Sequence, residues 1–135
     1  MITLINVYYE DNRHAILYEL LSERTPTMSI SHTGMPAYGE HVEFVESMPY
    51  QRWCFIHSSE EDAYVGTIYL SKQNEIGVFI FSKYQAKGYG KAAVQEIIAQ
   101  HDGPFLANVN PRNSVSRGMF EGVGFTHIQD TLRYG

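Results

Sequence analysis

The stretch from Gln85 to Lys91, QAKGYGK, combines residue types that can bind an anion. Gly88 and Gly90 let the main chain adopt conformations that other residues avoid and approach a bound group closely. An apolar-periodic run, AAVQEII, overlaps its end and predicts a helix that begins within the turn. The unpaired N–H groups and the dipole of such a helix start attract phosphate. The lysines nearby add positive charge: Lys83, Lys87 and Lys91.

Two common nucleotide-binding patterns do not fit this turn. Residues 88–93 match G-x-G-x-x-A, but that fingerprint opens a helix directly after a strand and has an acidic residue about 20 positions later. Here six residues separate the apolar run ending at Phe81 from Gly88, and asparagines occupy the region around Asn108. The Walker pattern also fails, because its Gly-Lys-Ser/Thr is missing. A purely structural turn remains the alternative to anion binding.

The other reactive side chains favour neither metal nor thiol chemistry. Cys54 is the only cysteine, which excludes an internal disulfide and a thiolate zinc cluster and favours a reducing compartment. Its place between Trp53 and Phe55 is typical of a small core residue. The six histidines lie far apart without H-x-x-x-H spacing, so we expect no metal site.

Alternating strands and helices must position the glycine turn. Polar breaks between three apolar runs predict a meander just before it. Expected strands cover residues 4–9, 52–57, 63–70, 75–81, 103–110 and 124–134. The first expected helix begins after Asp11 or Asn12 and ends at Thr25-Pro26, and a loop at 29–36 follows it. The second is a short helix with Pro36 at its start. The third runs from the glycine turn to about Gln100, and the fourth covers residues 111–122.

Length and charge restrict the class of protein. The 135 residues, 44% of them hydrophobic, predict one domain over residues 1–135. Residues 1–82 hold four basic and eleven acidic side chains, whereas residues 83–135 hold six and four. This asymmetry favours a polyanionic cofactor and a cationic or amine substrate over nucleic acid. Without a leader or a membrane-spanning run, the sequence predicts a soluble, cytoplasmic protein that does not bind a membrane.

The order of elements and two motifs resemble the GNAT superfamily of acyl-CoA N-acyltransferases. QAKGYG looks like the family's Gln/Arg-x-x-Gly-x-Gly/Ala signature, and the stretch from Asn113 to Phe125 looks like its asparagine-containing helix followed by Gly-Phe. The resemblance spans nearly the whole chain. It implies an α/β GNAT fold with a single mixed, mostly antiparallel sheet, splayed central strands and flanking helices.

The resemblance also implies acetyl-CoA as the cofactor. Main-chain N–H groups of the turn would bind the pyrophosphate, and the splayed strands would hold the pantetheine arm. The pyrophosphate set is Gln85, Ala86, Lys87, Gly88, Tyr89, Gly90 and Lys91. The other cofactor contacts implied are Phe79, Ile80 and Phe81 in one strand, Asn108 in the next, and Asn113, Ser116 and Phe120 on the short helix.

The reaction implied is direct acetyl transfer to a primary amine of a small molecule. An alkylammonium has a pKa near 10.4, so a base must take its proton, and Glu75 is the candidate. Glu75 could instead simply end a solvated hairpin. Phe120 replaces the tyrosine that many relatives use as a proton donor, and Ser116 is the substitute. Tyr38 and His41 on the second helix would meet the substrate.

The identity of the acceptor stays open at this stage. The Asn-x-x-Ser spacing of Asn113 and Ser116 resembles relatives that acetylate nucleotide-linked amino sugars and ribosomal N-termini. A polyamine, an aminoglycoside, and a protein lysine or N-terminus are alternatives. A non-catalytic acyl-CoA-binding module is a further alternative of another class, and a homodimer is compatible with the family.

Overall fold

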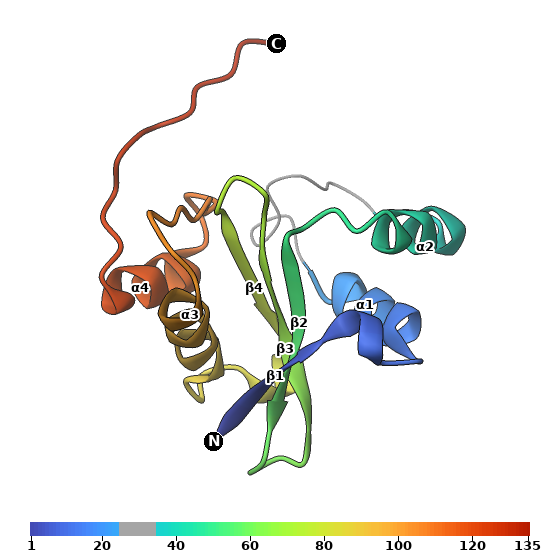
Figure 1. Cartoon of the computed structure of the whole chain (residues 1–135). Helices are drawn as coiled ribbons and strands as arrows, with labels where there is room; N and C mark the ends of the chain where they lie inside the picture. Colours follow the sequence, from blue (N-terminus) through green and yellow to red (C-terminus); the bar gives the residue numbers. More distant parts are fainter. Residues whose placement is uncertain (25–34) are drawn as a thin grey trace.

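The structure is a computed structural model that describes residues 1–24 and 35–135, and its centre is one antiparallel sheet (Figure 1). The strands are β1 (Ile2–Asn6), β2 (Arg52–Ser58), β3 (Ala63–Leu70) and β4 (Ile76–Ile80). They follow one another in the sheet in sequence order. Short polar turns join β2 to β3 and β3 to β4, so the predicted meander is confirmed.

Two pairs of helices cover the two faces of the sheet (Figure 1). The helices α1 (Arg13–Ser22) and α2 (Tyr38–Glu46) lie on one face, and α3 (Tyr89–Gln100) and α4 (Ser114–Val123) lie on the other. Short 3-10 turns, η1 (Val7–Tyr9) and η2 (Ser82–Tyr84), follow β1 and β4. The expected α/β fold with flanking helices is therefore confirmed.

Strand alternation divides the core into two clusters. Side chains such as Ile68, Leu70 and Ile76 pack against α3 and α4. Trp53 and Phe55 instead belong to the cluster beneath α1 and α2. No helix of the described residues is long and apolar enough to cross a membrane.

Two glycines let side chains and strands approach closely at β4. An added Cβ at Gly66 would lie 2.1 Å from the carbonyl oxygen of Phe79, and one at Gly77 would lie 2.2 Å from the ring of Tyr69. Gly66 pairs with Ile80, and Tyr69 pairs with Gly77. Hydrogen in place of a side chain therefore permits this strand spacing and this ring position.

Two predicted strands do not form in the described residues. In the segment 103–110, the pairing is a single parallel bridge between Glu75 and Leu106, with hydrogen bonds from Ile76 N to Leu106 O at 2.7 Å and from Leu106 N to Asn74 O at 2.9 Å. The four strands of the sheet are therefore all antiparallel, and the parallel part of the expected mixed sheet is reduced to this one bridge. After the bridge, the segment that contains Asn108 separates from β4.

The segment 124–134 runs away from the body of the molecule (Figure 1). Its residues Ile128 and Leu132 are exposed, and the segment pairs with no strand of the described chain. The first strand is also shorter than expected, since residues 7–9 form η1. Helix α1 ends at Ser22, while Thr25, Pro26 and most of the predicted loop at 29–36 fall outside the described residues.

Candidate active site

The glycine turn forms the N-terminus of α3. Ala86 and Gly88 have positive φ values of 63° and 84°, and Gly88 is the N-cap residue of the helix. The first helical hydrogen bond runs from Ala92 N to Gly88 O at 3.1 Å. Within the described chain, the main-chain N–H groups of residues 86–91 have no protein acceptor. These groups and the helix dipole can together bind a phosphate-type anion.

A polar network fixes this turn to the hairpin between β2 and β3. The hydroxyl of Tyr89 donates to Glu61 Oε2 at 2.9 Å and accepts from Ser58 Oγ at 3.2 Å. Lys87 Nζ forms an ion pair with the same Glu61 oxygen at 2.9 Å. The ring of Tyr89 is therefore an anchor in the core, so the predicted cofactor contact of this residue is limited to its main-chain N–H.

The remaining polar side chains of the turn have different roles. Gln85 Nε2 donates to the carbonyl oxygen of Ile80 at 3.1 Å and so ties the turn to the end of β4. Lys83 and Lys87 lie 5.1 and 5.9 Å from the ring centroid of Tyr84. Lys91 is exposed, and Gly90 packs near Ile80, with 3.7 Å to the position of an added Cβ.

The short helix α4 uses its predicted cofactor residues partly for its own structure. Asn113 is the N-cap, and its Oδ1 accepts from Ser116 N at 3.0 Å. Phe120 is 5% exposed and packs in the core, with its ring centroid 5.1 Å from that of Phe125. Ser116 is half-buried, and its hydroxyl has no hydrogen-bond partner in the described chain.

Glu75 and Asn108, predicted on separate grounds, lie together. Asn108 Nδ2 donates to Glu75 Oε2 at 2.5 Å, and Ser71 Oγ donates to Glu75 Oε1 at 3.2 Å. The main chain is fixed as well, because Glu75 N donates to Ser71 Oγ and Ser71 N donates to Glu75 O. Glu75 is therefore a half-buried carboxylate held by two donors at the point where β4 and the segment 103–110 diverge.

An aromatic face lies on the α1–α2 side of the sheet beside Glu75. We define it as Tyr50, Trp53, Tyr69 and Phe79. The rings of Tyr50 and Tyr69 stack with centroids 3.9 Å apart, and α2 reaches this face through Phe44. Burial raises the pKa of both tyrosines, so their hydroxyls stay protonated at neutral pH.

The predicted substrate residues Tyr38 and His41 lie at the contact between α1 and α2. Tyr18 packs edge-on to both, with ring centroids 5.0 Å from Tyr38 and 5.2 Å from His41. Tyr38 is 48% exposed, whereas His41 is 6% exposed and its buried Nε2 has no hydrogen-bond partner within the described chain. Neither side chain shares a ring contact with the aromatic face in the described residues.

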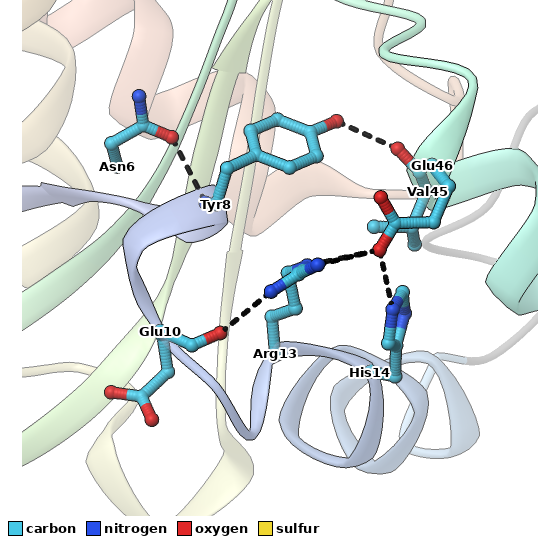
Figure 2. A network of polar contacts seen from close by, with 7 residues as sticks. All are labelled: Asn6, Tyr8, Glu10, Arg13, His14, Val45 and Glu46. Carbon is cyan, nitrogen blue, oxygen red and sulfur yellow. Dashed lines mark hydrogen bonds and ion pairs between the residues drawn. The ribbon is translucent and has the colours of Figure 1, made fainter.

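A polar network fastens α2 to α1 and η1 (Figure 2). Arg13 Nη2 and His14 Nε2 both lie 2.7 Å from Glu46 Oε1, and the hydroxyl of Tyr8 donates to the carbonyl of Val45 at 2.7 Å. Hydrogen bonds from Arg13 hold the pKa of Glu46 below its usual value, with a smaller effect of His14. This network positions α2, and through Phe44 it positions the edge of the aromatic face.

The remaining candidate chemistry has no support in the described residues. Cys54 is 1% exposed, and burial raises the pKa of its thiol. No group of three or more His, Cys, Asp or Glu side chains in the described part could hold a metal ion.

Sequence reasoning missed several site residues because only tertiary structure brings them together. The Ser71 hydroxyl on Glu75, the Tyr50–Tyr69 stack and the guanidinium of Arg24 over Phe79 join separate elements. Strand alternation alone could have placed Trp53 and Tyr69 on one face.

Comparisons with known proteins agree with this geometry. The sequence model of the Acetyltransferase (GNAT) family matches residues 14–125, which is most of the chain. The comparison with curated protein sequences gives no match.

Three solved structures share the fold at low sequence identity. A domain from Methanocaldococcus jannaschii has a TM-score of 0.84 at 20% identity, covering 97% of this chain and 92% of that one. A variant of spermidine N-acetyltransferase SpeG from Vibrio cholerae has a TM-score of 0.74 at 16% identity, covering 95% and 81%. YncA, a putative acetyltransferase from Salmonella typhimurium with its cofactor acetyl-CoA, has a TM-score of 0.71 at 14% identity, covering 93% and 79%.

Proposed function

The chain belongs to the GNAT family of acetyltransferases, and from this premise we propose that it transfers an acetyl group from acetyl-CoA to the primary amine of a small molecule. Use of acetyl-CoA and N-acetyl transfer follow from the family. The observation that carries the assignment to this chain's own residues is the glycine turn, where the N–H groups of residues 86–91 lack acceptors in the described chain.

The residues present fit the cofactor. A pyrophosphate needs several convergent donors, and the turn offers them at the N-terminus of α3 without a side chain on Gly88. At Gly88, apart from its chain neighbours and the adjoining helix backbone, no heavy atom of the described residues lies within 4 Å of an added Cβ, so the space beside this residue is open. When bound, acetyl-CoA supplies the acetyl thioester. Phe79, Ile80 and Phe81 would hold its pantetheine arm, and Asn113 would contact it from α4.

Glu75 is the proposed proton acceptor. An amine attacks only through its free lone pair, so the ammonium proton must first leave. The hydrogen bonds from Asn108 and Ser71 hold the carboxylate in one orientation, which is what a base at a fixed position requires. Ser116, half-buried on α4, would donate a proton to the departing thiolate.

A small amine is the preferred acceptor. The similar structures include spermidine N-acetyltransferases, whose names state a small-molecule amine substrate. The aromatic face supplies apolar and hydroxyl groups suited to a compact ligand. A homodimer, and Tyr38 and His41 as substrate contacts, remain predictions.

Cofactor binding gives the first test. Acetyl-CoA and CoA should raise the melting temperature of the protein, because a ligand bound only by the folded state stabilises it, whereas NAD and ATP should not. Gly88→Val should abolish the shift, since its φ of 84° is unfavourable for a β-branched residue and the new side chain enters the anion site. Gly39→Ala, in open space on α2, is the matched control. An unchanged shift in Gly88→Val would contradict the assignment.

Turnover gives the second test. Glu75→Gln keeps the shape of the side chain but removes its basicity, so CoA release with an amine panel should fall by roughly 10²- to 10⁴-fold. The thermal shift by CoA should persist. Glu43→Gln, an exposed change on α2, should behave like the wild type. A wild-type rate in Glu75→Gln would remove Glu75 from the mechanism.

A further inference from the structure

Arg24 lies beside the aromatic face without an acidic partner among the described residues. Its guanidinium carbon is 4.0 Å from the ring centroid of Phe79 on β4. Its Nε is buried and has no hydrogen-bond partner, and no carboxylate of the described chain pairs with it. Burial lowers the pKa of Arg24, because its charged guanidinium is partly removed from water. A desolvated cation without a counter-ion is costly, so an external anion would stabilise it.

The position of Arg24 is fixed by its neighbour. Glu23 Oε1 accepts from Ser82 N at 2.8 Å and from Ser82 Oγ at 2.9 Å. These bonds tie the end of α1 to η2, directly after β4. They also engage the acid next to Arg24 in the sequence, so the guanidinium is held near Phe79 while Glu23 does not neutralise it.

Arg24 and Glu75 act on the same part of the aromatic face. Burial raises the pKa of the Tyr69 hydroxyl, the charge of Arg24 lowers it, and the charge of Glu75 raises it. Tyr69 on β3 pairs with Gly77 on β4. Along β4, Gly77 lies between the first residue of the strand and Phe79. One cation and one carboxylate are therefore both within electrostatic range of this ring.

Several acids of the acidic first half of the chain are engaged by partners in the described residues. Glu46 pairs with Arg13 and His14, Glu61 pairs with Lys87, and Glu10 accepts from Tyr64. The cation beside the aromatic face is Arg24, and the carboxylate within electrostatic range of it is the proposed base Glu75.

We propose that Arg24 binds an oxyanion of the acceptor, so that the acceptor is an amine that also carries a carboxylate or phosphate group. This inference rests on the proposed function and names its substrate class. A guanidinium fork pairs with a planar oxyanion through two parallel N–H donors, and no guanidinium N–H group of Arg24 has a hydrogen-bond partner within the described chain. Such an acceptor is zwitterionic, with its ammonium toward Glu75, and it differs from a polyamine by its negative group.

Matched acceptor pairs test the proposal with the full chain and acetyl-CoA. Ornithine with putrescine, and tyrosine with tyramine, differ by a carboxylate; O-phosphoethanolamine with ethanolamine differs by a phosphate. CoA release should give a kcat/KM at least about 10-fold higher for the oxyanion member of an accepted pair. The pair type that shows this higher kcat/KM, carboxylate or phosphate, identifies the oxyanion that Arg24 binds.

Variants at Arg24 isolate its part. Arg24→Gln should lower kcat/KM roughly 10- to 100-fold for the oxyanion members and leave their counterparts within about twofold. Arg24→Lys keeps the charge but loses the guanidinium fork, so its kcat/KM for the oxyanion members should lie between those of the wild type and Arg24→Gln. Lys72→Gln removes an exposed positive charge and is the control. Retention of the CoA-induced thermal shift shows that each variant folds. A wild type that prefers putrescine, tyramine and ethanolamine, or an equal loss on both members, overturns the proposal.

A binding measurement separates this inference from the proposed function. With CoA present, the N-acetylated oxyanion products should raise the melting temperature of the wild type but not of Arg24→Gln. If no amine is acetylated, the proposed function fails, and this shift still decides the role of Arg24. Absence of a shift for every oxyanion product overturns the inference.

Discussion

Gly66→Ala tests the close approach of β3 and β4 that supports the proposed cofactor strand. The added Cβ would lie 2.1 Å from Phe79 O and 2.9 Å from Ile80 Cα, against an ordinary separation of roughly 3.5 Å. Both neighbours are main chain, so β4 itself must move. Overpacking costs about 1–3 kcal/mol and a weakened ladder hydrogen bond about 1 kcal/mol, while the stiffer unfolded chain returns about 0.5–1 kcal/mol. We expect a net loss of about 1.5–3 kcal/mol.

Urea denaturation of the variant measures this loss, and the melting temperature should fall by roughly 5–12 °C. The affinity for CoA should fall as well, since Phe79 and Ile80 are its proposed strand contacts. Gly118→Ala in α4 is the matched control: with no described heavy atom within 4 Å of its Cβ, it should stabilise the protein by about 0.5–1 kcal/mol through helix propensity. A wild-type urea midpoint and m-value for Gly66→Ala would refute the reasoning.

Two other predictions concern the helices. Burial lowers the pKa of His41 below its ordinary value near 6.5, with the charge of His14 as a second cause, so the unfolded chain binds this proton more readily. Stability should therefore fall as the pH drops through about 6.5, and His41→Gln should flatten the melting temperature between pH 7 and 5; an unchanged slope would contradict this. Asn113→Ala should cost about 1 kcal/mol in urea denaturation through the lost N-cap, while Asn113→Asp keeps the cap, so any loss of CoA affinity in Asn113→Asp reports the proposed cofactor contact.

Much of the fold could be predicted because its signals are local. Glycine placement, apolar periodicity and polar breaks predict α3, its N-terminal turn and the β2–β4 meander, and the structure has all of them. The segments 103–110 and 124–134 have strand-like composition, but a strand also requires an edge at the right place. Composition does not specify that edge, and these two predictions were wrong for the described chain.

The candidate site was predictable to the same extent. The turn and Glu75 could be found from residue type and order, since each lies at the end of an element. The anchoring of Tyr89 on Ser58 and Glu61, and the place of Arg24 over Phe79, depend on residues far apart in the sequence. No local pattern encodes those distances.

The contact between Gly77 and Tyr69 has a consequence for how this site can change over generations. Because a Cβ at position 77 would coincide with the Tyr69 ring, Gly77 admits no larger residue while the tyrosine keeps its place. Replacing Tyr69 by a small residue removes that restriction and makes substitutions of Gly77 tolerable. The order of mutations therefore matters: an evolving or engineered lineage that reshapes the aromatic face must lose the tyrosine first, and the reverse path crosses a destabilised intermediate.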